Sequence, residues 1–123
     1  MSDQFAIYRQ QARRYDQLKA REDYQQRLLP ALSAIRSFDR ADLVEWGAGT
    51  GWLSALVAPQ ARSLVACDLN PHMLHVAAEH YRPFEHLRWR LVSADHRRAP
   101  LPDRVADVAL AWGTVCYLAS EFA

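Results

Sequence analysis

Residues 43–54 constrain the fold of this chain more than any other stretch. An apolar run containing Glu45 is followed by three glycines at alternate positions, Gly47, Gly49 and Gly51, and then by an apolar helical pattern. This order predicts a strand, a tight turn and the start of a helix. Glycines allow a ligand to approach the backbone, and the first N–H groups of a helix are unpaired. The stretch therefore predicts a cradle for a nucleotide cofactor.

The chain on both sides of this stretch alternates between short apolar runs and helical patterns. Such alternation is typical of βα units in a parallel sheet, so we predict an α/β fold. The second helix should start at Asn70, because Asn is a preferred N-cap and Pro71 suits the first helical position. The predicted strands are residues 42–46, 63–67, 87–93 and 106–112, and the predicted helices are residues 52–58 and 71–81.

The pattern of apolar and charged residues in the predicted strands indicates the order of the strands in the sheet. Three of them are nearly continuous apolar runs, as expected for strands covered on both faces. The strand at 87–93 instead alternates, with Trp89 on one side and Arg88 and Arg90 on the other. Charged side chains of this kind are typical of an edge strand. The strand order 3-2-1-4 satisfies this condition and places a ligand-binding switch point between strands one and four.

The N-terminal part of the chain has a helical pattern from Phe5 to about Ile35. Apolar residues recur at steps of three and four, and Pro30 favours a kink or a restart. Two helices or one bent helix fit the pattern equally well. We predict that residues 1–37 form a helical segment that caps the cofactor site, and that residues 38–123 form the cofactor-binding domain.

Composition excludes several classes of protein. The chain has 123 residues, is 50% apolar and carries a formal net charge of +1, so we expect one globular domain and no polyanionic partner. Its two cysteines, Cys67 and Cys116, do not suggest a disulfide framework. The N-terminus lacks the apolar region of a signal peptide, and no stretch approaches membrane-spanning length. We therefore expect a cytoplasmic protein with no membrane partner.

The spacing of the glycines separates three families of cofactor site. A phosphate-binding P-loop ends in Gly-Lys-Ser/Thr, whereas Trp52 and Leu53 follow Gly51 here. The dinucleotide pattern G-x-G-x-x-G would need glycine where Trp52 stands. The pattern acid-x-G-x-G-x-G is met in full by Glu45 and the three glycines.

With these residues the chain resembles the S-adenosylmethionine-dependent methyltransferases of the seven-stranded, Rossmann-like type. Residues 67–74 resemble the family's second-strand motif, residues 93–95 its third, and residues 99–112 its approach to strand four. The four motifs follow one another in the family's order and spacing. The resemblance covers about residues 39–118 and implies the N-terminal part of a Rossmann-like domain, apparently truncated after strand four.

The resemblance implies a set of cofactor-binding residues. Asp68 would accept hydrogen bonds from the ribose hydroxyls, a role that its position about twenty residues beyond the first glycines also favours. Asp95 would accept a bond from the adenine amino group, and Glu45 would face the methionine ammonium. The set comprises Glu45, Gly47, Ala48, Gly49, Gly51, Asp68, Leu69, Met73, Asp95, His96, Trp112 and Tyr15.

Some of these assignments have structural alternatives. Leu69 and Met73 would support the adenine ring, although a methionine on a helix serves the core equally often. Tyr15 would close over the methionine end, whereas an aromatic residue at helical spacing is usually part of the core. His72 and His75 stand one helical turn apart but lack a convincing third ligand, so no metal site is expected.

The function implied by the resemblance is transfer of a methyl group from S-adenosylmethionine to a small-molecule acceptor, with S-adenosylhomocysteine as product. Tyr15, His96 and Tyr117 are candidates for a general base, and the sequence does not choose among them. A module that binds the cofactor without catalysis is the alternative, and a nicotinamide-dependent reductase is a weaker one. Because the family fold needs three further strands, we expect either a fragment or a homodimer paired along strand four.

Overall fold

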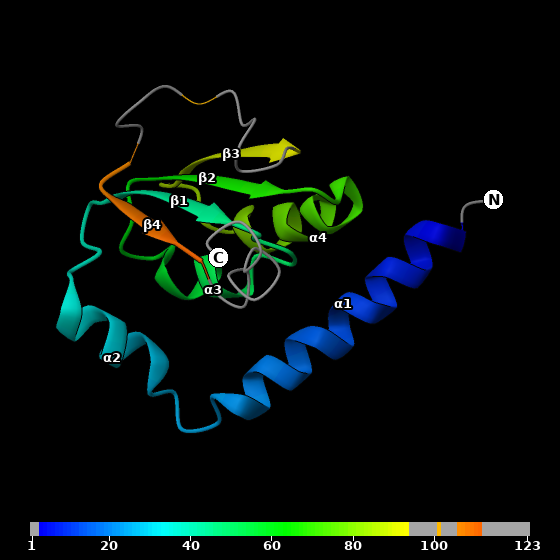
Figure 1. Cartoon of the computed structure of the whole chain (residues 1–123), viewed down its shortest axis with the longest axis horizontal. Helices are drawn as coiled ribbons and strands as arrows, with labels where there is room; N and C mark the ends of the chain where they lie inside the picture. The colour runs from blue at the N-terminus through cyan, green and yellow to red at the C-terminus, as the bar shows by residue number, and fades with distance from the viewer. Residues whose placement is uncertain (1–2, 94–100, 102–105, 112–123) are drawn as a thin grey trace, which may run out of the picture.

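The computed structural model describes residues 3–93, 101 and 106–111. Helices and strands alternate after an N-terminal helical pair, as the sequence predicts (Figure 1). The helices are α1 (Asp3–Glu22), α2 (Leu28–Ile35), α3 (Trp52–Val57) and α4 (Pro71–Tyr81), and the strands are β1 (Asp42–Trp46), β2 (Ser63–Asp68), β3 (Arg88–Ser93) and β4 (Val108–Leu110).

The four strands form one parallel sheet in the order β3-β2-β1-β4, which confirms the predicted order. Strand β1 lies inside the sheet, with Glu45 paired to Ala66 on β2 and to Leu110 on β4. Strand β3 is an edge, and its two arginines, Arg88 and Arg90, are exposed. In a parallel sheet the carboxyl ends of the strands meet at one side, so the glycine-rich turn after β1 lies beside the end of β2.

The turn into α4 follows the predicted N-cap chemistry. The Asn70 side chain accepts a hydrogen bond of 2.9 Å from the N–H of His72, and Pro71 occupies the first helical position. An N-cap acceptor satisfies one of the N–H groups that a helix start leaves unpaired. This cap fixes the direction in which α4 leaves β2.

The core lies between the sheet and the helices that follow β1 and β2. Its most buried side chains come from both layers and include Leu43, Val57, Leu64 and Tyr81. Helix α4 packs against β2, β3 and α3, and α1 packs on the outer side of α4. Helix α1 contacts α4, and its Tyr15 also lies beside the glycine-rich turn and Glu45 of β1.

The N-terminal segment forms two helices, not one bent helix. The break falls at residues 23–27, where the Asp23 carboxylate accepts hydrogen bonds of 3.0 Å from the N–H groups of Arg27 and Leu28. Pro30 sits in the first turn of α2, where a missing N–H costs no intrahelical bond. Both helices lie below the sheet in Figure 1.

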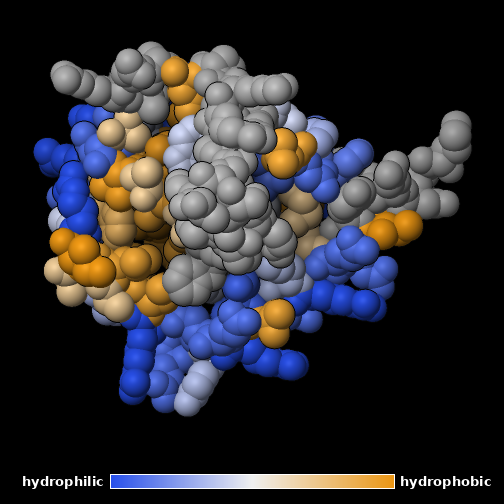
Figure 2. Space-filling view, viewed as in Figure 1, coloured by the Kyte–Doolittle hydropathy of each residue, from blue (hydrophilic) through white to orange (hydrophobic). Residues whose placement is uncertain are grey.

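The surface differs between the two N-terminal helices. Figure 2 shows hydrophilic residues along α1 and a group of apolar residues at the left, around α2. Leu28, Leu29 and Leu32 are partly buried against the core, and Ile35 is 84% exposed. Among the described helices, none combines the length and the apolar character that a membrane span requires.

Several element boundaries differ from prediction. Helix α3 ends one residue earlier, β2 extends to Asp68, and β3 begins at Arg88. Strand β4 covers Val108–Leu110 of the predicted 106–112. Immediately before it, Asp107 donates its N–H to the carbonyl of Asp42 at the amino end of β1. Its Oδ2 accepts a 2.9 Å hydrogen bond from the N–H of Asp42. Trp112 and the helix expected after Gly113 lie outside the described residues.

Candidate functional site

The turn after β1 has the backbone conformation that its glycines predict. Gly47, Gly49 and Gly51 have φ angles of 66°, 57° and 76°, in the region that side-chain-bearing residues avoid. The N–H of Ala48 donates a 2.9 Å hydrogen bond to the carbonyl of Cys67 at the end of β2. The turn is thereby held against the next strand, and the start of α3 lies directly behind it.

Two of the glycines are also close to side chains of α4. A Cβ atom on Gly51 would lie 2.5 Å from the Tyr81 hydroxyl oxygen and 3.0 Å from the Ala77 Cβ. A Cβ on Gly49 would be 3.8 Å from the Met73 Cε, which is an ordinary contact. Gly51 is therefore required by packing as well as by its φ angle, whereas Gly49 is required by its φ angle alone.

Glu45 is a buried acid at the end of β1. Its side chain is 2% exposed and accepts a hydrogen bond from the Ser54 hydroxyl on α3. Burial raises the pKa of the Glu45 carboxyl to about 8, and the nearby charge of Asp68 adds to this rise, while the Ser54 hydrogen bond opposes it. A carboxyl group of this kind carries a proton near neutral pH and becomes an anion when a cation is placed beside it.

Tyr15 of α1 lies beside this acid. A small cavity of about 10 Å³ adjoins both side chains, and its lining consists of Tyr15, Glu45, Gly47, Ala48, Trp52 and Leu53. A volume of this size holds roughly one water molecule. The structure thus brings together the N-terminal tyrosine and the first residues of the turn, although they are thirty residues apart in the sequence.

Asp68 ends β2 on the other side of the turn. One carboxylate oxygen accepts a 2.8 Å hydrogen bond from the N–H of Gly49, and the other accepts a 2.8 Å bond from the N–H of Asn70. Each oxygen retains a second acceptor position, since a carboxylate offers about four. The acid therefore orders the turn and can also accept hydrogen bonds from a ligand. Next to it, Leu69 is 73% exposed.

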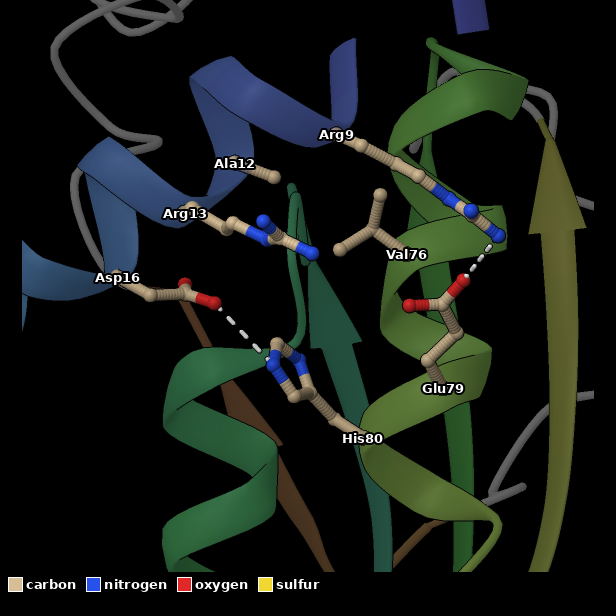
Figure 3. Close-up of a pocket in the computed structure, with 7 residues that line it drawn as sticks. All are labelled: Arg9, Ala12, Arg13, Asp16, Val76, Glu79 and His80. Carbon is tan, nitrogen blue, oxygen red and sulfur yellow. Dashed lines mark hydrogen bonds and ion pairs between the residues drawn. The ribbon is translucent and has the colours of Figure 1, made fainter. Parts of the chain in front are cut away.

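A hydrogen-bonded cluster that the sequence analysis missed joins α1, the turn and α4. The Thr50 hydroxyl donates a 2.6 Å hydrogen bond to Asp16 Oδ1. Figure 3 shows the second contact of this carboxylate, in which Asp16 Oδ2 lies 3.1 Å from His80 Nε2. The other ring nitrogen, Nδ1, is 2.5 Å from the Thr50 carbonyl oxygen. The three residues are far apart in sequence, and no motif signals their contact.

The cluster forms one end of a groove between α1 and α4. The groove has a volume of about 320 Å³, and Arg13 extends into it (Figure 3). At its other end Arg9 forms an ion pair of 2.8 Å with Glu79. The groove and the cavity beneath Tyr15 have no lining residue in common.

Three predicted cofactor-binding residues, Asp95, His96 and Trp112, lie outside the described residues. Within residues 3–93, 101 and 106–111 there is no group of three or more histidine, cysteine or acidic residues placed to hold a metal. Cys67 is buried at the end of β2, and burial raises the pKa of its thiol to about 11.

Comparison with known proteins decides the family. A family model described as "Methyltransferase domain" matches residues 43–122, which is more than half of the chain. This chain belongs to that family. Its parallel sheet with the order β3-β2-β1-β4 is the first part of the Rossmann-like methyltransferase fold, and S-adenosylmethionine is the cofactor typical of the class.

Curated relatives and solved structures agree with this membership. Demethylmenaquinone methyltransferase of Tropheryma whipplei is 32% identical over 69 residues, which are 56% of this chain and 28% of that protein. A protein of Methanococcus maripaludis described as an S-adenosyl-L-methionine-dependent methyltransferase matches with a TM-score of 0.68 and 23% identity, over 86% of this chain and 50% of its own. The chain therefore spans half or less of the length of these relatives.

A third match is phosphoethanolamine N-methyltransferase 1 of Haemonchus contortus, solved with phosphoethanolamine and S-adenosylhomocysteine. It has a TM-score of 0.56 and 18% identity, and the match covers 66% of this chain and 17% of that one. At this identity the similarity concerns the fold alone.

The geometry of the turn fits the class cofactor. The left-handed glycines leave the backbone accessible, Asp68 retains acceptor positions, and Glu45 is a buried acid for which the cavity beneath Tyr15 provides no cationic partner among the described residues. An acid in this state is suited to an ammonium group.

Proposed function

We propose that this protein binds S-adenosylmethionine at the turn after β1 and transfers its methyl group to a small-molecule acceptor. The observation that carries the proposal is the buried carboxyl of Glu45, placed in one cavity with Tyr15, Gly47 and Ala48. A buried carboxyl that has only a hydroxyl partner keeps its proton, and a ligand ammonium would supply the cation that stabilises its ionised form.

In this proposal each described residue has a binding role. Glu45 accepts a hydrogen bond from the methionine ammonium, and Asp68 accepts bonds from the ribose hydroxyls. Leu69, exposed at 73%, and Met73 offer apolar contact to the adenine ring. The segment 1–37 caps the methionine end through Tyr15. Asp95, His96 and Trp112 keep the roles that the family resemblance implies.

Catalysis would depend mainly on how the protein places the cofactor's methyl group relative to the acceptor. When bound, the cofactor would supply an electrophilic methyl group on its sulfonium. The nucleophilic atom of the acceptor would attack the methyl carbon in line, and the S–CH3 bond would break so that S-adenosylhomocysteine leaves. The protein's own residues would hold the methionine end, align it with the acceptor and exclude water from it. Because the sulfonium is already reactive, the site needs no strong base unless the acceptor has to lose a proton.

A small-molecule acceptor is supported by charge and by relatives. The formal net charge of only +1 gives the chain no strong overall attraction to a nucleic acid. Relatives named for demethylmenaquinone and phosphoethanolamine methylation act on small molecules. We also keep the prediction that two chains can pair along β4, and light scattering of the purified protein would test it.

Calorimetry with S-adenosylmethionine and S-adenosylhomocysteine tests the binding step, and transfer of labelled methyl to a metabolite extract tests catalysis. Asp42→Asn is a matched control for Glu45→Gln, because both acids lie on β1 but Asp42 is at the opposite end. Binding without transfer would support a non-catalytic module. No binding of either compound would contradict the proposal, and competition by NAD or NADP would favour a reductase.

A further inference from the structure

The cluster of Asp16, Thr50 and His80 joins three elements at one point. Asp16 is on α1, Thr50 is in the glycine-rich turn, and His80 is in the last turn of α4. Thr50 is fully buried, and both Asp16 and His80 are partly shielded from solvent. Helix α1 is thus fixed to the turn itself as well as to α4.

The chemistry of the cluster sets the charge of His80. Its Nδ1 faces the Thr50 carbonyl and its Nε2 faces the Asp16 carboxylate, and both of these groups only accept hydrogen bonds. A neutral imidazole has a single N–H and can donate to only one of them. The observed geometry therefore corresponds to a doubly protonated, cationic His80.

The position of Tyr15 depends on the same cluster. Tyr15 precedes Asp16 directly, and its ring lines the cavity that also contains Glu45. Since Asp16 is bonded to the turn, the backbone beside Tyr15 is fixed relative to the glycines. The cavity beneath it holds roughly one water molecule, so a ligand enters only when the ring turns or α1 moves.

We propose that Asp16 and His80 are positioning residues, and that cationic His80 holds α1 so that Tyr15 covers the methionine end of the bound cofactor. The inference rests on the proposed function, because Tyr15 has a ligand to cover only if the turn binds one. It assigns Asp16 and His80 a role in cofactor affinity, and this role depends on pH.

The direction of the pH dependence follows from the surroundings of His80. The hydrogen bond to Asp16 raises the pKa of His80 above the usual 6.5, and the Thr50 carbonyl adds to this rise while burial opposes it. The other charged groups that line the same groove are Arg9 and Arg13 on α1 and Glu79 on α4. The cluster is complete at acid pH and is lost as the pH rises through the raised pKa.

Calorimetry with S-adenosylhomocysteine at about pH 6 and about pH 9 tests the inference. His80→Gln keeps one donor but removes the titration, and Asp16→Asn keeps the shape but removes the charge. At the lower pH each should weaken binding about fivefold, the effect of one hydrogen-bonded ion pair. Asp42→Asn is the control, because Asp42 is an acid that pairs with Arg62 at the amino end of β1 and belongs to neither α1 nor α4.

Rising pH weakens cofactor binding through His80 but strengthens it through Glu45, because the ionised Glu45 carboxylate favours a cationic ligand. The His80 contribution is therefore the difference between the wild-type and His80→Gln pH profiles. In the cofactor-free protein, NMR titration of the His80 ring should give a lower pKa in Asp16→Asn than in the wild type.

The outcomes separate the two proposals. Three results together would support the positioning role: weaker binding in both variants at the lower pH, a difference between the wild-type and His80→Gln profiles that shrinks as the pH rises, and normal binding in Asp42→Asn. Normal binding in His80→Gln at both pH values, or a His80 pKa unchanged in Asp16→Asn, would overturn it while leaving the proposed function in place. If the wild type binds no cofactor, the proposed function and the positioning role both fail.

Discussion

The two ends of strand β1 each carry an acid, and the two acids differ in almost every property. Asp42, at the amino end, accepts hydrogen bonds from Arg62 and Ser63, which hold the pKa of its carboxyl at about 2. Glu45, three residues later, is buried beside Ser54, and burial raises its pKa to about 8. The same strand thus holds one carboxylate that stays charged and one carboxyl that carries a proton.

The difference separates a structural role from a binding role. Asp42 is fully paired within the protein, so its charge stabilises the junction of β1 with β2. Glu45 has a hydroxyl partner but no cation among the described residues, and it lines the cavity beside the glycines. Ionisation of this buried acid at high pH lowers the free energy of unfolding of the protein. A cationic ligand beside Glu45 would stabilise the ionised carboxylate and offset this loss.

The largest expected effect comes from replacing Gly51, which supports the carboxyl end of β1. Gly51→Ala should destabilise the protein by about 2–5 kcal/mol, because a left-handed φ and a Cβ 2.5 Å from the Tyr81 hydroxyl act together. Urea unfolding measures it. Gly49→Ala, with an ordinary 3.8 Å contact, should cost only about 1–2 kcal/mol. Equal losses in the two variants would contradict the packing role of Gly51.

Replacing Glu45, the buried acid, should change the affinity for the cofactor more than the free energy of unfolding. Glu45→Gln keeps the shape of the side chain and removes the anion, so affinity for S-adenosylmethionine should fall by about tenfold to a hundredfold, the contribution of a charge-assisted hydrogen bond. Asp42→Asn should bind as the wild type does. An equal loss in both variants would mean that Glu45 has no special contact with the ligand.

The stability of the cofactor-free protein should show the same contrast. Because the folded pKa of Glu45 is raised from 4.5 to about 8, the folded state binds its proton more tightly, and stability falls as the pH rises across that interval. Glu45→Gln should remove this decline. Urea unfolding at several pH values measures it, and a decline of unchanged size in the variant would assign the effect to another group.

The smallest effect should come from the amino end of β1. Asp42→Asn should cost less than about 1 kcal/mol near neutral pH, since the pair with Arg62 lies at the surface. The depressed pKa of Asp42 stabilises the wild type above the usual 3.8, and this contribution is lost as the pH falls toward about 2. Acid unfolding curves that coincide for wild type and variant would contradict this assignment.

The sequence predicted the parts of the molecule that depend on local spacing. The glycines at alternate positions predicted the turn, Asn70 and Pro71 predicted the start of α4, and the alternation around Arg88 and Arg90 predicted the edge strand. Each of these features depends on neighbouring residues, so the sequence contains the whole signal.

The remaining features depend on how distant segments pack. The cluster of Asp16, Thr50 and His80 joins residues 34 and 30 positions apart, and it exists only because α1 packs on α4. The protonation of Glu45 likewise depends on burial by residues of other elements. The contacts of Asp107 with Asp42, which lie just before β4, also leave no local pattern in the sequence.

The most direct test of the account is calorimetry of S-adenosylmethionine binding in two buffers of different ionisation enthalpy. If the ligand ammonium meets the protonated Glu45, binding at about pH 6.5 should release close to one proton, because the cation drives the carboxyl to ionise. Glu45→Gln should bind more weakly and release none. Binding by the wild type with no proton release, or with release that persists in Glu45→Gln, would contradict the placement of the cofactor beside Glu45.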